Sequence, residues 1–170
     1  MGLQFADAVG LRTVGIDAAD RPLELARSLG TKARIFDART ADPEAIVRQL
    51  GKEDGAVERE EMGVDAAIIL VESQAGFDFG FKLLKNHGTC IIVSYAEKGF
   101  RVPSRDLVYR DIRVVGTILG SNKMLREMME LVAKHGVKPV TTVFPFEKLN
   151  ELVEQYHKGK GGKFVVEMEH

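Results

Sequence analysis

Short apolar runs alternate with amphipathic, charge-bearing segments along all 170 residues of the chain. The runs have the length and β-branched content of strands, and the segments between them carry apolar residues at helical spacing. Such alternation is typical of an α/β fold in which the strands lie parallel and helices cover the sheet. We therefore expect an α/β protein with a Rossmann-like, doubly wound and mostly parallel sheet.

No internal repeat or interdomain linker interrupts this alternation, so residues 1–170 are expected to form one domain. Asp20 is expected to cap a helix that Gly30 ends, Asp42 and Pro43 to open another, and Ser73 to open a third that Gly88 closes. Residues 51–63 are expected to be a surface loop or a frayed helix end. The expected strands and extended segments are residues 12–16, 33–36, 64–71 (fully buried), 89–95, 100–108, 112–119, 140–144 and 163–168, and the other expected helices are 3–9, 124–135 and 146–157.

The charge balance argues against a nucleic-acid or anionic-membrane surface, because 24 basic residues face 25 acidic ones and the formal charge is −1. No apolar run approaches the length of a membrane span, and no signal-peptide pattern opens the chain. The single cysteine, Cys90, excludes an internal disulfide and a cysteine-based zinc cluster, and it reads as an inert core residue. A cytoplasmic protein is the default expectation.

Residues 13–17, Thr-Val-Gly-Ile-Asp, read as a strand that ends on an acid. In a dinucleotide-binding βαβ unit the second strand ends in Asp or Glu, whose carboxylate accepts hydrogen bonds from the adenosine ribose. Asp17 is therefore the strongest candidate for a binding residue, and the alternative is a solvated acid in a turn. A free carboxylate at this place repels a 2′-phosphate and so favours NAD; Arg21 could accommodate NADP only with a change of geometry.

The glycine turn that cradles the pyrophosphate in such a unit should lie about 20 residues before the acid. The residues before Asp17 contain no G-x-G-x-x-G and no apolar strand. We therefore expect a cofactor-binding domain that is truncated at its N-terminus and starts at the first helix of the motif.

Further candidate residues follow the expected strands. Ligands of open α/β sheets bind outside the carboxyl ends of the strands, where Val71, Glu72, Ser94 and Tyr95 are expected. Ordinary strand-to-helix loops are an equal alternative for each of them, and nothing in the sequence pairs with Glu72 to make it a general base. Lys163 follows a glycine-rich loop and could neutralise phosphate charge, against the alternative of a solvated turn.

The histidines suggest no catalytic or metal site. His87, His135 and His157 fall near expected helix ends, where a cation is favoured by the helix dipole. No spacing of His, Cys, Asp or Glu matches a metal site, and no Ser-His-Asp arrangement, nucleophile elbow or Walker loop is present. The chain carries binding residues and no visible catalytic machinery.

Several stretches, in unbroken order from about residue 3 to residue 168, carry a family resemblance. They are residues 3–17, residues 86–93 (N-H-G-T-C-I-I-V), residues 112–120 (I-R-V-V-G-T-I-L-G), residues 145–151 (P-F-E-K-L-N-E) and residues 158–163. Together they resemble the zinc-dependent, medium-chain alcohol dehydrogenases, and most nearly the microbial and fungal type.

The resemblance implies the cofactor domain of an NAD-dependent alcohol oxidoreductase. By position, Asp17 would bind the adenosine ribose, and Val71 and Glu72 would flank the adenine. Ser94, Tyr95 and Leu119 would lie near the nicotinamide. Lys163 would stand on the pyrophosphate. Strands at Phe100 to Ser104 and Ile112 to Thr117 would pair edge to edge in a homo-oligomer.

The family's zinc ligands, substrate pocket and proton relay belong mainly to an N-terminal, GroES-like catalytic domain, which is expected to be absent here. NAD is the expected cofactor, and zinc is expected in the intact enzyme only. The missing first strand is central in a doubly wound sheet, so its loss would open two inner edges. The chain is then expected to rearrange, to oligomerise or to be marginally stable, and to be inactive alone.

Two other functions fit the same sequence. The first is a non-catalytic Rossmann-like module that binds partners or copies of itself through its sheet edges. The second is a fragment of a zinc-free, quinone-reductase-like oxidoreductase, against which Asp17 weighs because those relatives usually favour NADP.

Overall fold

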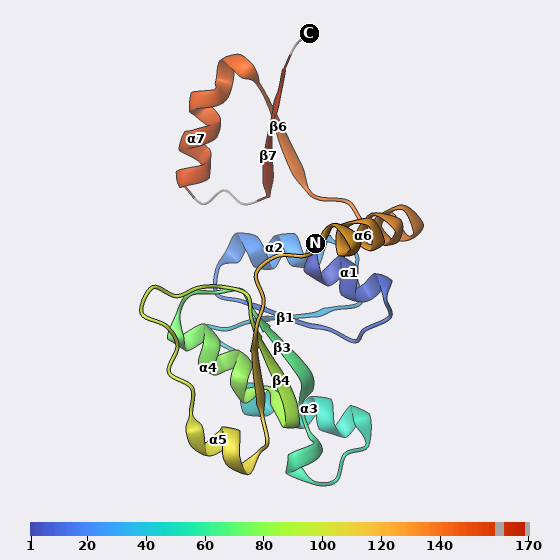
Figure 1. Cartoon of the computed structure of the whole chain (residues 1–170), viewed down its shortest axis with the longest axis vertical. Helices are drawn as coiled ribbons and strands as arrows, with labels where there is room; N and C mark the ends of the chain where they lie inside the picture. The colour runs from blue at the N-terminus through green and yellow to red at the C-terminus, as the bar shows by residue number, and fades with distance from the viewer. Residues whose placement is uncertain (159–161, 169–170) are drawn as a thin grey trace. The chain divides into compact units, whose positions relative to one another are not determined.

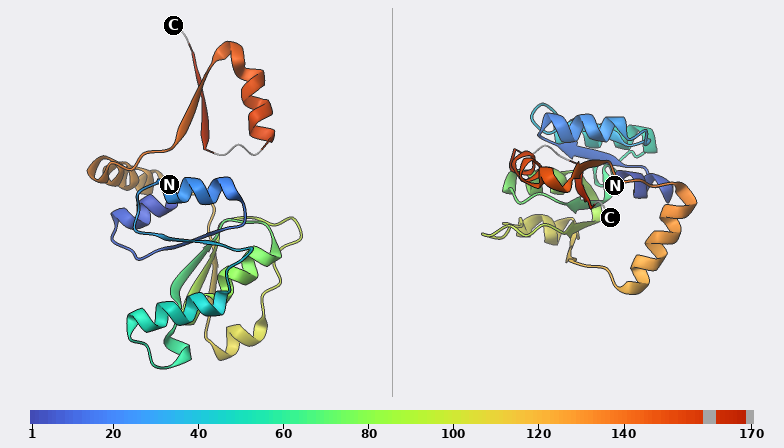
Figure 2. Two further views of the ribbon diagram at one scale, coloured as in Figure 1. Left: turned by 180° about the vertical axis from the view of Figure 1, so that it is seen from behind. Right: turned by 90° about the horizontal axis from the view of Figure 1, so that it is seen from above.

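The computed structural model describes residues 1–158 and 162–168 (Figures 1 and 2). The chain divides into two compact units, unit 1 with residues 1–37 and 120–170 and unit 2 with residues 38–119. Each unit is described by itself. That they form one domain stays a prediction from the sequence.

A parallel three-stranded sheet forms the centre of unit 2, with the strand order β3-β4-β5. The strands are β3 (Val64–Ile69), β4 (Leu84–Ile92) and β5 (Arg113–Gly116). Helix α4 (Gln74–Lys82) links β3 to β4, and the short helix α5 (Ser104–Tyr109) precedes β5 (Figure 1). Parallel strands joined through helices confirm the expected α/β class.

The core of unit 2 lies on one face of this sheet. Phe77 of α4 is 0% exposed, and its ring stacks on Phe81 at 5.4 Å and on Phe100 at 4.9 Å between centroids. Burying an aromatic side chain of this size stabilises the fold by about 2–3 kcal/mol. The other buried members of the cluster are Ala67, Ile69, Leu84, Cys90 and Ile112.

The opposite face of β3 is open in unit 2. Along the strand, Ala67 and Ile69 are buried, whereas Ala66, Ile68 and the following Leu70 are exposed. The prediction of a fully buried strand at residues 64–71 is therefore wrong: the apolar run has the length of a buried strand, but its side chains alternate between the packed face and the open one.

Helix α3 (Pro43–Asp54) begins as predicted, with Asp42 as its N-cap. The Asp42 carboxylate accepts hydrogen bonds from the backbone N–H of Glu44 and of Ala45, both at 3.2 Å. The expected loop at residues 51–63 is wrong in part, since α3 continues to Asp54 and a 3₁₀ turn, η1 (Arg59–Glu61), follows.

Two expectations around β4 are wrong. The strand begins at Leu84 instead of residue 89, because Leu83 and Leu84 are buried and α4 ends before them, so Gly88 does not close the helix. His87 lies inside β4 and not at a helix end. Its φ is +61°, and its backbone N–H donates to the Arg110 carbonyl at 2.9 Å. Its ring nitrogen Nδ1 lies 2.9 Å from Asp111 Oδ2.

The expectation of an extended segment at residues 100–108 is also wrong, because α5 begins at Ser104 and no strand is assigned at Phe100–Ser104. Phe100 packs into the core instead. The Gln74 side chain holds the segment to α4: its Nε2 donates to the Arg101 carbonyl at 3.0 Å, and its Oε1 accepts from the Arg101 N–H at 2.9 Å.

Unit 1 contains a second parallel pair, β1 (Val14–Asp17) with β2 (Arg34–Asp37), linked by α2 (Asp20–Ser28) and preceded by α1 (Gly2–Ala8). Asp20 is the first residue of α2 and Ala19 is its N-cap, so the expected Asp20 cap is wrong. Among the residues that the structure describes, no strand joins the β1-β2 pair to the β3-β4-β5 sheet, which leaves one edge of β1 and one edge of β3 unpaired.

The rest of unit 1 starts with α6 (Asn122–His135), whose N-cap Ser121 accepts from the Met124 N–H at 3.3 Å. A parallel pair of strands follows, β6 (Thr141–Pro145) with β7 (Lys163–Glu167), beside α7 (Leu149–His157) (Figure 2). A 3₁₀ turn, η2 (Phe146–Lys148), lies between β6 and α7. His135 and His157 are the last residues of α6 and α7, as predicted.

Gly63, just before β3, supplies a test of unit 2. Its φ is +122°, and a Cβ there would overlap the carbonyl oxygen of Leu83. We expect Gly63→Ala to lower the free energy of unfolding by more than about 2 kcal/mol in urea denaturation. Gly55→Ala is the control, with φ +70° and nothing within 4 Å, and we expect it to cost about 1 kcal/mol. Equal losses of unfolding free energy in the two variants would contradict the close approach of Gly63 to the Leu83 carbonyl oxygen.

Candidate functional site

A crevice lies at the carboxyl ends of β4 and β5 in unit 2. It has a volume of about 300 Å³ and is lined by Ile92, Val93, Ser94, Tyr95, Gly116, Thr117 and Ile118. Parallel strands end at the same edge of a sheet, and their last residues can meet one ligand there. This is where the sequence predicts a binding site.

Ser94 connects the ends of two strands. Its Oγ donates to the Val71 carbonyl at 2.6 Å, while the N–H groups of Val93 and Ser94 both donate to the Ile69 carbonyl, at 3.1 and 3.2 Å. Three hydrogen bonds therefore hold the segment after β4 against the segment after β3. The structure brings Val71, Ser94 and Tyr95 to one edge of the sheet.

Glu72 and Leu119 are placed next to this edge and do not line the crevice. Glu72 is exposed and precedes Ser73, the N-cap of α4, whose Oγ accepts from the Gly76 N–H at 3.2 Å. Leu119 is 85% exposed and follows the lining residue Ile118. That either residue contacts a ligand stays a prediction.

Sequence reasoning missed Gly116 and Thr117. Gly116 ends β5 beside Ile92, and the Thr117 N–H donates to the Ile92 carbonyl at 3.1 Å. The available signal was a glycine followed by a small polar residue at the end of an apolar strand, at the same sheet edge as Ser94. Such residues let a ligand approach the backbone closely.

Asp17 ends β1 in unit 1. Its Oδ1 accepts from the N–H groups of Ala18 and Ala19, at 2.8 and 2.9 Å, and this fixes the carboxylate at the turn into α2. Asp37 ends β2 directly beside it in the strand register. The prediction that this strand ends on an acid is confirmed, whereas a role of Asp17 in binding stays a prediction.

Lys163 is the first residue of β7, also in unit 1, and its N–H donates to the Val140 carbonyl at 2.9 Å. Gly159, Lys160 and Gly161 of the glycine-rich loop lie outside the described residues. Asp17 and Lys163 thus belong to unit 1, whereas Val71, Glu72, Ser94, Tyr95 and Leu119 belong to unit 2.

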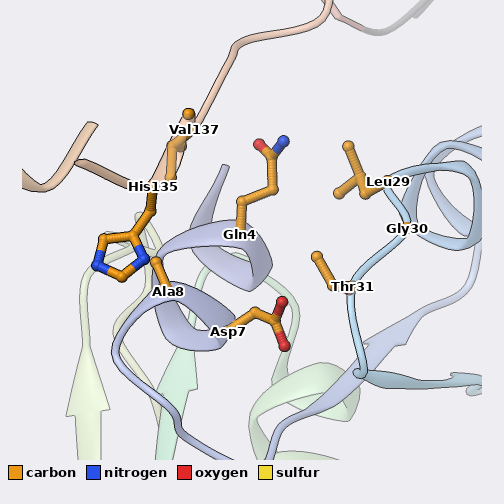
Figure 3. Close-up of a pocket in the computed structure, with 9 residues that line it drawn as sticks. Gln4, Asp7, Ala8, Leu29, Gly30, Thr31, His135 and Val137 are labelled. Carbon is orange, nitrogen blue, oxygen red and sulfur yellow. The ribbon is translucent and has the colours of Figure 1, made fainter. Parts of the chain in front are cut away.

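A second pocket lies within unit 1 (Figure 3). It has a volume of about 270 Å³ and is lined by residues of α1, of the segment after α2 and of the end of α6 with the two residues that follow it: Gln4, Asp7, Ala8, Leu29, Gly30, Thr31, His135, Gly136 and Val137. Asp7 Oδ1 accepts from the Lys32 N–H at 3.3 Å, and the buried Gln4 Oε1 has no hydrogen-bond partner. None of the predicted site residues lines this pocket.

Burial raises the pKa of the Cys90 thiol, which keeps the sulfur protonated and unreactive at neutral pH. In the described ranges, 1–158 and 162–168, no group of three or more His, Cys, Asp or Glu side chains could hold a metal ion. None of the helices in the same ranges is long and apolar enough to cross a membrane.

The sequence of this chain is similar to those of known proteins. Residues 1–134 match the family described as zinc-binding dehydrogenase. The chain belongs to this family. An alcohol dehydrogenase of Geobacillus stearothermophilus is 27% identical over 170 residues, which are 99% of this chain and 47% of that protein. One from Moraxella sp. is 30% identical over 98% of this chain and 46% of that protein.

Solved structures agree with this assignment. The alcohol dehydrogenase from Aeropyrum pernix superposes with a TM-score of 0.72 at 26% identity, over 93% of this chain and 43% of that one. AibC superposes with a TM-score of 0.77 at 19% identity, which supports the Rossmann-like fold alone. The chain spans about half the length of the curated relatives that it matches.

The Ser94–Val71 bond gives a test of how the site is held. We expect Ser94→Ala to lower the free energy of unfolding by about 1 kcal/mol, because it removes a link between two strand ends. Ser28→Ala is the control. The Ser28 Oγ donates at 2.8 Å to Leu25 within one exposed helix, so its loss should change stability by less than about 0.5 kcal/mol. Equal effects in chemical denaturation would contradict a positioning role for Ser94.

Proposed function

We propose that this chain is the dinucleotide-binding part of an NAD-dependent, zinc-type alcohol dehydrogenase. In the intact enzyme it would take part in the transfer of a hydride between an alcohol and the nicotinamide, giving an aldehyde or ketone. By itself it is proposed to bind the dinucleotide without turning over an alcohol.

The observation that carries this proposal is the crevice at the carboxyl ends of β4 and β5, in a chain of the zinc-binding dehydrogenase family. Ile92, Val93 and Ile118 make its wall apolar, which suits the face of an aromatic ring. Gly116 and Thr117 bring backbone groups to its rim. The chemistry of these residues fits a nicotinamide held by packing and by backbone hydrogen bonds.

NAD would supply the carbon that takes up the hydride. Ser94, Tyr95 and Leu119 are proposed to orient the nicotinamide and to keep water from it. Tyr95 is 86% exposed in this structure, and a bound ring would give it a partner. Val71 and Glu72 are proposed to flank the adenine from the end of β3.

The residues of unit 1 are proposed to bind the polar parts of the cofactor. The Asp17 carboxylate, held by Ala18 and Ala19, would accept hydrogen bonds from the adenosine ribose hydroxyls and exclude a 2′-phosphate. The ammonium of Lys163 would neutralise pyrophosphate charge. The described residues do not fit a zinc site, so no zinc ligand is assigned to them.

Assembly of the chain is a further part of the proposal. β5 forms one edge of its sheet, and homo-oligomerisation through residues 112–117 is supported by that free edge. The expected companion strand at Phe100–Ser104 is not part of it, because that segment leads into α5. The same free edge favours the second candidate function, a non-catalytic module that acts through sheet edges.

A cytoplasmic location is proposed on the single, buried Cys90.

Calorimetric titration with NADH tests the function. We expect saturable binding by the full chain, and we expect Asp17→Asn to raise the dissociation constant about tenfold or more, since a charged acceptor contributes about 1.5–3 kcal/mol. The amide oxygen can still accept from Ala18 and Ala19, so the turn is preserved. The same variant should narrow the preference for NADH over NADPH.

Glu127→Gln is the matched control, because it makes the same change of charge on an exposed face of α6 in the same unit. It should leave the NADH affinity unchanged. A folded chain that does not bind NADH would overturn the proposal and leave the assembly function as the one to test. An equal loss in both variants would show a general charge effect.

A further inference from the structure

We draw no further inference here: the strongest candidate, the pocket of unit 1 between α1, the segment after α2 and the end of α6, where the buried Gln4 Oε1 accepts no hydrogen bond from the described residues, is lined by the first helix of a chain that spans about half the length of its relatives, and nothing in the structure shows what fills it.

Discussion

Burial of Phe77 is the constraint on which unit 2 depends. This side chain from α4 lies under the sheet between Phe81 and Phe100, and its contacts fix α4, the segment before α5 and one face of β3 and β4. Removing such a ring from a packed core typically costs about 3–5 kcal/mol. The strand ends occupy their places because this face of the sheet is packed.

The crevice follows from that packing. With β3, β4 and β5 parallel and held on one side, their carboxyl ends meet at a single edge, and Ser94 joins two of them through the Val71 carbonyl. Apolar wall residues and small residues at the rim then make a surface that suits a flat ring. Binding at such a site depends on the position of the lining groups more than on reactive side chains.

The same packing covers only one of the two faces of β3. One face of the strand is buried, but its other face and its outer edge carry apolar side chains and unpaired backbone groups. Parallel strands usually have both faces covered, so β3 combines the composition of a fully buried strand with one exposed face.

Local signals in the sequence were sufficient for the elements whose ends are set by nearby residues. Asp42 with Pro43 opens α3, the αL glycines Gly30 and Gly136 follow α2 and α6, and Asp17 ends a strand, because capping and turn geometry involve residues only a few positions apart.

Tertiary structure decided what depends on residues far apart in the chain. Leu84 joins β4 and Phe100 leaves its expected strand because both are drawn into the core around Phe77. The run at residues 64–71 is buried on one face or on both, depending on which elements pack against it. The periodicity of a short apolar run does not distinguish these two cases. By itself, the sequence determined the α/β class, most helix boundaries and the acid at the end of β1. Only long-range packing decided the crevice at Ser94 and the exposed face of β3 at Ile68, because each depends on elements that meet only after the chain has folded.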